Sequence, residues 1–160
     1  MQKLLEALRG TSRAFAAVAG IALCALMILT VADVVLRLLG HPIVGTYELV
    51  GMAGAVAVGF SLPLTSWLRG HVYVDSFIAK LPPRGRAAVN LVTRAAVLVL
   101  FLLLGWNLIA FALDLRRSGE VSPTLRLPFY PVAFGVGIAC LLQCLVIAAD
   151  AVKILRGRYE

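Results

Sequence analysis

Charged residues are scarce in this sequence. Only 14% of its 160 residues are Asp, Glu, Lys or Arg, whereas 61% are hydrophobic, and the mean hydropathy is +0.96. A soluble domain carries about 45–50% apolar and about 25% charged residues, and a chain this short leaves much of its surface exposed. Such an apolar surface needs lipid as its solvent, so the composition excludes a water-soluble globular domain.

Residues that usually build chemical centres are also few. The chain has two histidines, His41 and His71, and three cysteines, Cys24, Cys140 and Cys144. Neither histidine lies in a long apolar run, so the paired histidines of a membrane haem subunit are missing. The cysteines all lie inside apolar runs and are expected to behave as small hydrophobic residues. Because no nucleophile–base pair, phosphate-binding glycine loop or metal-ligand set occurs either, we expect no catalytic residue, no cofactor and no metal.

Long apolar runs dominate what remains. Each is close to the roughly 20 residues that a helix needs to cross about 30 Å of hydrocarbon. The four runs are residues 14–36, 49–67, 95–113 and 129–149. Lipid cannot satisfy the hydrogen bonds of an open backbone, so each run is expected to be a helix. The sequence therefore predicts an all-α integral membrane protein, a single membrane domain over residues 1–160, with helix extended into the first and third spans from residues 3–13 and 84–94.

Basic residues are divided unevenly between the two sides of the membrane. With four spans, the N-terminus, the 68–94 connection and the C-terminus share one side and hold eleven Lys and Arg residues, while the other side holds four. The positive-inside rule places both termini in the cytoplasm. The net charge of +7 then reflects topology and contact with anionic membrane lipids, and no nucleic-acid partner is expected. The first apolar stretch, 14–32, is longer than a signal-peptide core and is interpreted as a retained span.

A short amphipathic segment follows the second span. Apolar residues recur there at positions i, i+3, i+4 and i+7, namely Val74, Phe77, Ile78 and Leu81. Asp75 or Ser76, at the start of this pattern, can cap the N-terminus of a helix. Residues 72–81 are too short to span the membrane, so we expect an interfacial helix in the cytoplasmic headgroup plane.

The preceding Arg69, Gly70 and His71 are interpreted as the bend at the membrane edge, where glycine permits an unusual backbone conformation. His71 and Asp75 are four residues apart, which is a possible spacing for two metal ligands, but two ligands do not make a site. A hydrogen-bonding anchor between them, or to a neighbouring chain, is the favoured interpretation.

Charges near the outer ends of the first two spans form the next candidate cluster. Asp33 and Arg37 are four residues apart and can neutralise each other on one helix face, and Glu48 is expected within reach of Arg37. Ionisable groups in a membrane span are functional candidates, so one interpretation is a carboxylate that carries a proton or contacts substrate. The favoured interpretation is structural, with ion pairs joining the helices or a partner subunit, because a proton-driven carrier would place its carboxylate at mid-membrane.

Two further features concern packing. The outer segment 118–131 contains Pro123, Pro128 and Pro131, which restrict the backbone; it is either a loop that starts the fourth span or a surface for a soluble partner. Small residues in the second span, with Gly51 and Gly59 each four residues from Ala55, suit close helix packing.

Three stretches together resemble a known family. They are VADVVLRLLGHPIVGTYELVG at 31–51, LRGHVYVD at 68–75 and SPTLRLPFY at 122–130. In their order and spacing they resemble the small membrane subunit, DctQ-like, of tripartite ATP-independent periplasmic (TRAP) transporters. The residues that match the family pattern are Arg37, Glu48, Gly70, His71, Asp75, Pro123 and Pro128, which the resemblance assigns to structure and subunit contact.

The resemblance implies a scaffold in the bacterial inner membrane. Its implied partners are a large permease subunit, which carries the substrate and sodium sites, and a periplasmic binding protein that delivers an organic acid. Because no large subunit is fused before Glu160, that partner is expected to be a separate chain. The alternative is a self-sufficient four-helix proton-coupled carrier acting as a dimer, for which Asp33 is the nearest approximation to the carboxylate required.

Overall fold

Four helices make up the computed structural model, which describes residues 2–68 and 83–155. They are α1 (Gln2–Leu38), α2 (Thr46–Trp67), α4 (Pro83–Ser118) and α5 (Tyr130–Leu155). The described residues form no strand, and their one β-type contact is an isolated bridge between Val121 and Pro128. The all-α prediction is therefore confirmed.

All four helices are long and apolar enough to cross a membrane. The spanning segments are Glu6–Leu38, Thr46–Trp67, Val92–Ser118 and Tyr130–Asp150. The prediction of four long apolar helices is thus confirmed, and so are the two helical extensions, since α1 and α4 continue over 37 and 36 residues. A helix of that length is about 54 Å long, so it must tilt or project beyond the hydrocarbon.

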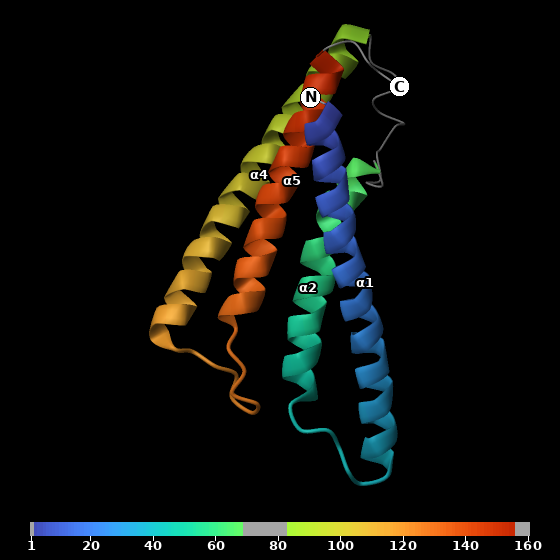
Figure 1. Ribbon diagram of the computed structural model, residues 1–160, viewed down its shortest axis with the longest axis vertical. Coiled ribbons are helices and arrows are strands. Elements are labelled where there is room, and N and C mark those ends of the chain that lie inside the picture. The colour runs from blue at the N-terminus through green and yellow to red at the C-terminus, as the bar shows by residue number, and fades with distance from the viewer. Residues whose placement is uncertain (1, 69–82, 156–160) are drawn as a thin grey trace.

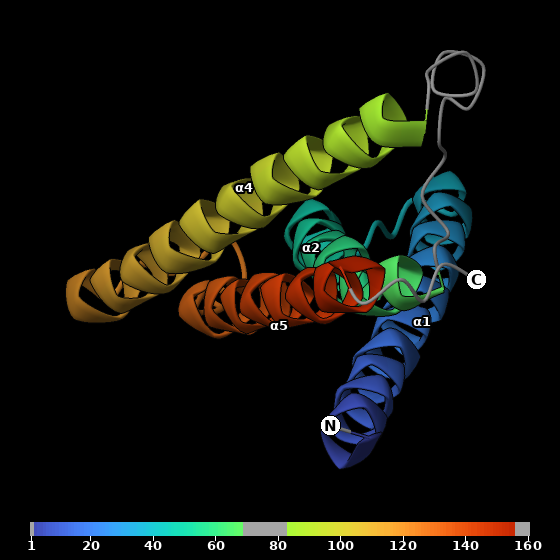
Figure 2. The ribbon, with the colours of Figure 1, turned by 90° about the horizontal axis from the view of Figure 1, so that it is seen from above.

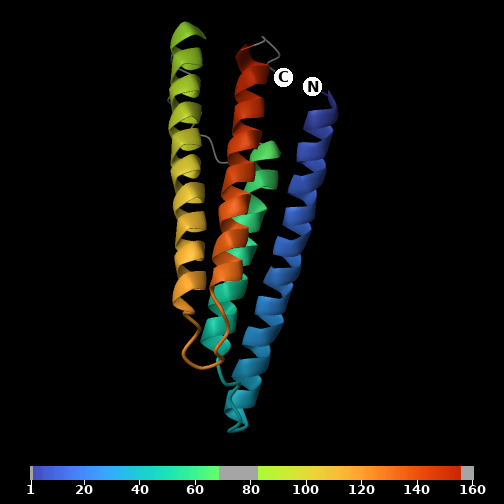
Figure 3. The same cartoon turned by 60° about the vertical axis from the view of Figure 1, so that its left-hand side comes forward.

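The helices form two hairpins that meet through α2 and α5. α1 packs on α2, α2 on α5, and α5 on α4, while α1 makes only slight contact with α5. Figures 1 and 3 show the resulting order, with α1 and α4 on the outside. Viewed along the bundle in Figure 2, α5 lies between α4 and α1. Within residues 2–68 and 83–155, both outer helices consequently keep a long face on which no other helix packs.

The two described connections, residues 39–45 and 119–129, lie at one end of the bundle, which we call the loop end (Figure 1). α1 begins and α5 ends at the opposite end. This alternation is the one expected for four consecutive crossings of a bilayer.

Glycines allow the inner helices to approach closely. A Cβ on Gly59 of α2 would lie 2.7 Å from a methyl carbon of Val136 on α5, and one on Gly137 would lie 2.9 Å from Ile109 on α4. A Cβ on Gly54 would lie 3.7 Å from Leu26 of α1, whereas a Cβ on Gly51 would have no described atom within 4 Å outside its own surroundings in α2. The small residues of the second span therefore serve two different interfaces, and Gly51 serves neither.

Polar side chains also join neighbouring helices. Gln143 of α5 is fully buried and donates through Nε2 to the hydroxyl of Ser66 on α2. Farther from the loop end, Arg94 of α4 forms an ion pair with Asp150 of α5. A polar group in lipid needs such a partner, so these contacts specify which helices pair.

Candidate functional site

Two carboxylates at the loop end organise the two connections. Asp33, near the end of α1, has only 8% of its side chain exposed. Its Oδ2 accepts a hydrogen bond from Arg37 Nη2 at 2.7 Å, and its Oδ1 accepts one from the backbone N–H of Ile43 at 2.9 Å. The pair forms as its four-residue spacing predicts, but the carboxylate also binds the following connection. Asp33 therefore fixes residues 39–45 against the helix they leave.

Glu48 performs the corresponding role for the second connection. One oxygen, Oε2, accepts from the hydroxyl of Ser122 at 2.6 Å and from the N–H of Leu125 at 2.9 Å. The other, Oε1, accepts from the N–H of Thr124 at 2.7 Å. Hydrogen bonds to an ionised acceptor are stronger than neutral ones. Three of them on one side chain attach the 119–129 connection to the first turn of α2.

Ser122 connects this attachment to the interior of the loop. It is 1% exposed, and its hydroxyl oxygen, besides donating to Glu48, accepts from the N–H of Leu127 at 3.1 Å. Backbone bonds join Ser122 N–H to the carbonyl of Leu127 at 2.9 Å, and the N–H of Arg126 to the carbonyl of Ser122 at 3.1 Å. The loop is thus closed on itself as well as on α2.

This closure forces one residue into a rare conformation. Arg126 has a φ of 53°, a left-handed value that costs a residue with a side chain on the order of 1 kcal/mol. The hydrogen bonds on either side of it, and the bridge between Val121 and Pro128, compensate. Pro123 is exposed and Pro128 is half-buried in the same loop. The side chain of Arg126 is exposed, and the hydrogen bonds of the loop hold its backbone in place.

The two connections contact each other. Gly45 has a φ of 80°, and a Cβ there would overlap the side chain of Leu125. Glu48 nevertheless forms its hydrogen bonds with residues 122–125, while Arg37 pairs with Asp33. The sequence suggested Arg37 as a partner for Glu48. In the structure, two backbone N–H groups and the hydroxyl of Ser122 donate to the carboxylate of Glu48.

Four predicted residues lie outside the described part of the chain. They are Arg69, Gly70, His71 and Asp75. The predicted interfacial helix, residues 72–81, also lies outside it, so these predictions stay predictions.

Sequence reasoning missed Ser122 and Gln143. Nothing in the local pattern distinguishes Ser122 from any other loop serine, because its partner is 74 residues away. Gln143 did carry a signal, since it is the one amide in an otherwise apolar run, 129–149. A polar side chain in a span calls for a partner on another helix.

The polar groups at the loop end are hydrogen-bonded within the chain. Asp33 and Glu48 are both engaged by donors of the same chain. Over residues 2–68 and 83–155, no three His, Cys, Asp or Glu side chains gather closely enough to hold a metal ion. Cys140 and Cys144 are buried, and the thiol of Cys144 lies 3.7 Å from the carbonyl oxygen of Leu98. These groups hold helices and loops in place.

Four long apolar helices, with Asp33, Glu48 and Gln143 hydrogen-bonded to other parts of the chain, define a multi-pass membrane protein. Residues 26–157 match the family described as tripartite ATP-independent periplasmic transporters, DctQ component. The chain belongs to this family, the small component of TRAP transporters, which is a family of transporter subunits and not of enzymes. A search of curated proteins returned no match to the chain.

Proposed function

We propose that this chain is a stationary scaffold subunit in sodium-driven uptake of an organic acid. A separate large permease subunit carries the substrate and sodium sites and moves, while a periplasmic binding protein delivers the substrate. The small subunit holds the large one at a fixed depth and orientation in the membrane. The family match supports the complex, and the structure of the loop end supports the scaffold role.

The observation that carries the scaffold role is the bonding of Glu48. A carboxylate that moves a proton or contacts a substrate must exchange its hydrogen-bond partners, whereas Glu48 accepts three hydrogen bonds from one loop, from Ser122, Thr124 and Leu125, at 2.6–2.9 Å. Asp33 is similarly held between Arg37 and Ile43. A self-sufficient proton-coupled carrier would have to break this bracing in every cycle. Fixed loops suit a part that stays still while its neighbour moves.

The orientation belongs to the same proposal. We place the loop end in the periplasm of a bacterial inner membrane and both termini in the cytoplasm, because the Lys and Arg residues concentrate at the terminal side. The amphipathic pattern of residues 72–81 then lies at the cytoplasmic headgroups, where an in-plane helix would resist vertical displacement.

Single cysteines test the orientation. In a background with Cys24→Ala, we expect Glu120→Cys to react with a membrane-impermeant maleimide in cells whose outer membrane is permeabilised. Lys3→Cys should react only after the inner membrane is opened. Both residues are exposed, Glu120 at the loop end and Lys3 near the start of α1. The reverse labelling pattern would contradict the orientation.

Association tests the scaffold role. The tagged chain, co-expressed with a TRAP large permease subunit from the same genome and purified in mild detergent, should retain that subunit at a fixed stoichiometry. A four-helix membrane protein of unrelated family, tagged in the same way, provides the control. Purification of the chain without the large subunit, under conditions that keep the chain folded, would overturn the proposal.

A further inference from the structure

The outer face of α4 carries a regular row of exposed residues. Their positions are alternately three and four residues apart, which is the spacing of the contact positions in a heptad repeat. All are exposed: Thr93, Ala96, Leu100, Leu103, Asn107, Ala110 and Asp114. We call this row the α4 seam. It continues through the spanning segment Val92–Ser118.

The seam points away from the contact of α4 with its own bundle. That contact is made by the opposite side of the helix, where Ala112 and Leu115 are 2% and 4% exposed and Gly105 fits against Leu141 of α5. Along the seam, by contrast, Leu100 and Leu103 are 54% and 56% exposed. From Thr93 to Asp114, one side of α4 is therefore packed and the other is open to the rest of the described chain.

Asn107 makes this open side unsuited to lipid. It lies near the middle of the spanning segment, and one N–H of its side-chain amide donates to the carbonyl of Leu103 at 2.8 Å. No described residue donates to its Oδ1. Hydrocarbon offers no donor, and a polar group exposed to it costs free energy that a hydrogen bond from another helix would recover.

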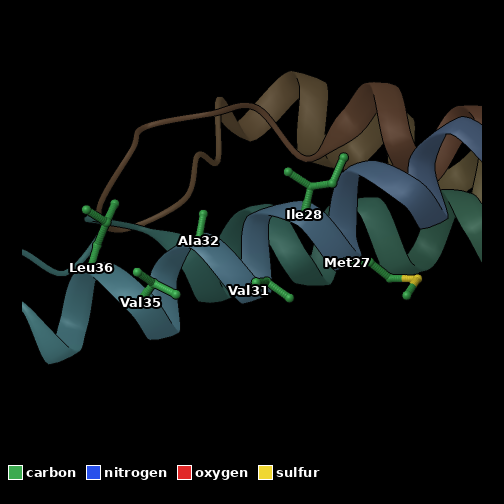
Figure 4. Close-up of a pocket in the computed structure, with 6 residues that line it drawn as sticks. All are labelled: Met27, Ile28, Val31, Ala32, Val35 and Leu36. Atoms are coloured by element: carbon green, nitrogen blue, oxygen red, sulfur yellow. The ribbon is translucent and has the colours of Figure 1, made fainter.

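The open face of α1 is apolar, as expected of a surface that faces lipid. Six side chains line a shallow apolar depression there, and none is polar (Figure 4): Met27, Ile28, Val31, Ala32, Val35 and Leu36. The neighbouring Thr30 donates its hydroxyl to the carbonyl of Leu26 at 2.7 Å, which satisfies its one donor. α1 thus provides an internal comparison for α4.

The pattern also indicates what kind of partner would cover the α4 seam. Heptad spacing matches the knobs-into-holes packing of another helix crossing at about 20°, and the small side chains of Ala96 and Ala110 allow that helix to approach closely. A polar residue at a single contact position fixes register and partner.

A second copy of this chain is a poor fit. In a symmetric parallel pair, Asp114 would oppose Asp114, and like charges at opposed positions repel. The carboxylate of Asp114 is 3.7 Å from Arg117, with both side chains at least 73% exposed, so a helix bearing a donor or a basic residue is the complementary neighbour.

We propose that the α4 seam packs against a transmembrane helix of the large permease subunit, which donates a hydrogen bond to Asn107 and presents a donor or basic residue toward Asp114. This assignment rests on the proposed function, since it names the surface through which the scaffold holds its partner. α1 keeps its apolar face toward lipid.

Photo-crosslinking in membranes tests the assignment directly. Benzoylphenylalanine replaces Leu103 on the α4 seam or, as the matched control, Val31 on α1, in cells that also make the large subunit. Illumination should join position 103 to the large subunit, identified by its mass and peptides, whereas position 31 should give no such adduct. Only lipid adducts, or only adducts between two copies of this chain, at position 103 would overturn the proposal.

Substitution of the amide tests the role of Asn107. Asn107→Leu should weaken association with the large subunit about threefold, the size of a single interhelical hydrogen bond in a membrane, while Asn107→Gln should retain most of it. Thr30→Val on α1 is the control and should have no effect. If the Asn107→Leu variant associated with the large subunit as strongly as the wild-type chain does, the proposed hydrogen bond to Asn107 would be ruled out.

These tests separate the two proposals. If the wild-type chain retains the large subunit but neither the adduct nor the Asn107 effect is found, the α4 assignment fails and the scaffold function stands. If the wild-type chain retains no large subunit, both fail.

Discussion

The hydroxyl of Ser122 donates to Oε2 of Glu48 across 2.6 Å, although 74 residues separate them in the sequence. The same hydroxyl oxygen accepts from the N–H of Leu127. One buried serine therefore links the first turn of α2 to both sides of the loop before α5. This link makes the loop end a fixed surface, because Asp33 already holds the 39–45 connection against α1 through the N–H of Ile43.

Glu48→Gln should loosen the 119–129 loop. The amide keeps the shape of the side chain but has one acceptor oxygen and an NH₂ group, which faces the N–H of Thr124 or Leu125. Loss of a charge-assisted hydrogen bond shifts local opening by on the order of tenfold. Limited proteolysis in detergent should accordingly show faster cleavage within the loop. Glu120→Gln is the matched control, since Glu120 is exposed in the same loop; equal cleavage of the two variants would contradict the role of Glu48.

Asp33→Asn tests whether the other carboxylate stabilises the chain or takes part in transport. Removing the charge weakens the pair with Arg37 and the hold on Ile43, so the isolated chain should unfold at a lower temperature. If the chain is a scaffold as proposed, uptake by the assembled complex should persist, because Asp33 would then carry neither a transported proton nor substrate. Arg37→Gln breaks the same pair from the other side and should behave alike. Loss of uptake in a fully assembled Asp33→Asn complex would show instead that the carboxylate takes part in transport.

Two glycines of α2 should respond differently to alanine. At Gly59 the new Cβ would lie 2.7 Å from Val136, so Gly59→Ala must displace α5, at a cost of about 1–3 kcal/mol. At Gly51 nothing lies within 4 Å, so Gly51→Ala should leave stability unchanged or raise it slightly. Thermal unfolding in detergent measures both, and Val136→Ala should rescue Gly59→Ala. Equal effects of the two single substitutions would mean that α2 and α5 do not pack as described.

The helices could be predicted from the sequence because lipid imposes a simple rule on apolar runs. Residues 14–36 and 129–149 had to be helical, and the extensions of α1 back to Gln2 and of α4 back to Pro83 continue favourable helical sequence. The order of packing could not be predicted. It depends on contacts such as Gly59 with Val136 and Gln143 with Ser66, which join residues distant in the chain.

The candidate site was predictable only where its contacts are local in the sequence. Asp33 and Arg37 are four residues apart on one helix, so local geometry was sufficient to pair them. Glu48 is bound by Ser122, which lies 74 residues later in the chain, and its proximity to Arg37 in sequence suggested a different partner. The converging N–H groups that bind it arise from the loop's backbone conformation, including the left-handed Arg126, which no residue pattern announces.

Sodium-driven uptake in reconstituted vesicles tests the central claim most directly. Vesicles receive this chain alone, the large permease subunit alone, or both, with the substrate-loaded binding protein supplied on the loop-end side. The account predicts accumulation of the organic acid only when both membrane chains are present, and none with this chain alone. Sodium-dependent accumulation by this chain alone would contradict the scaffold account.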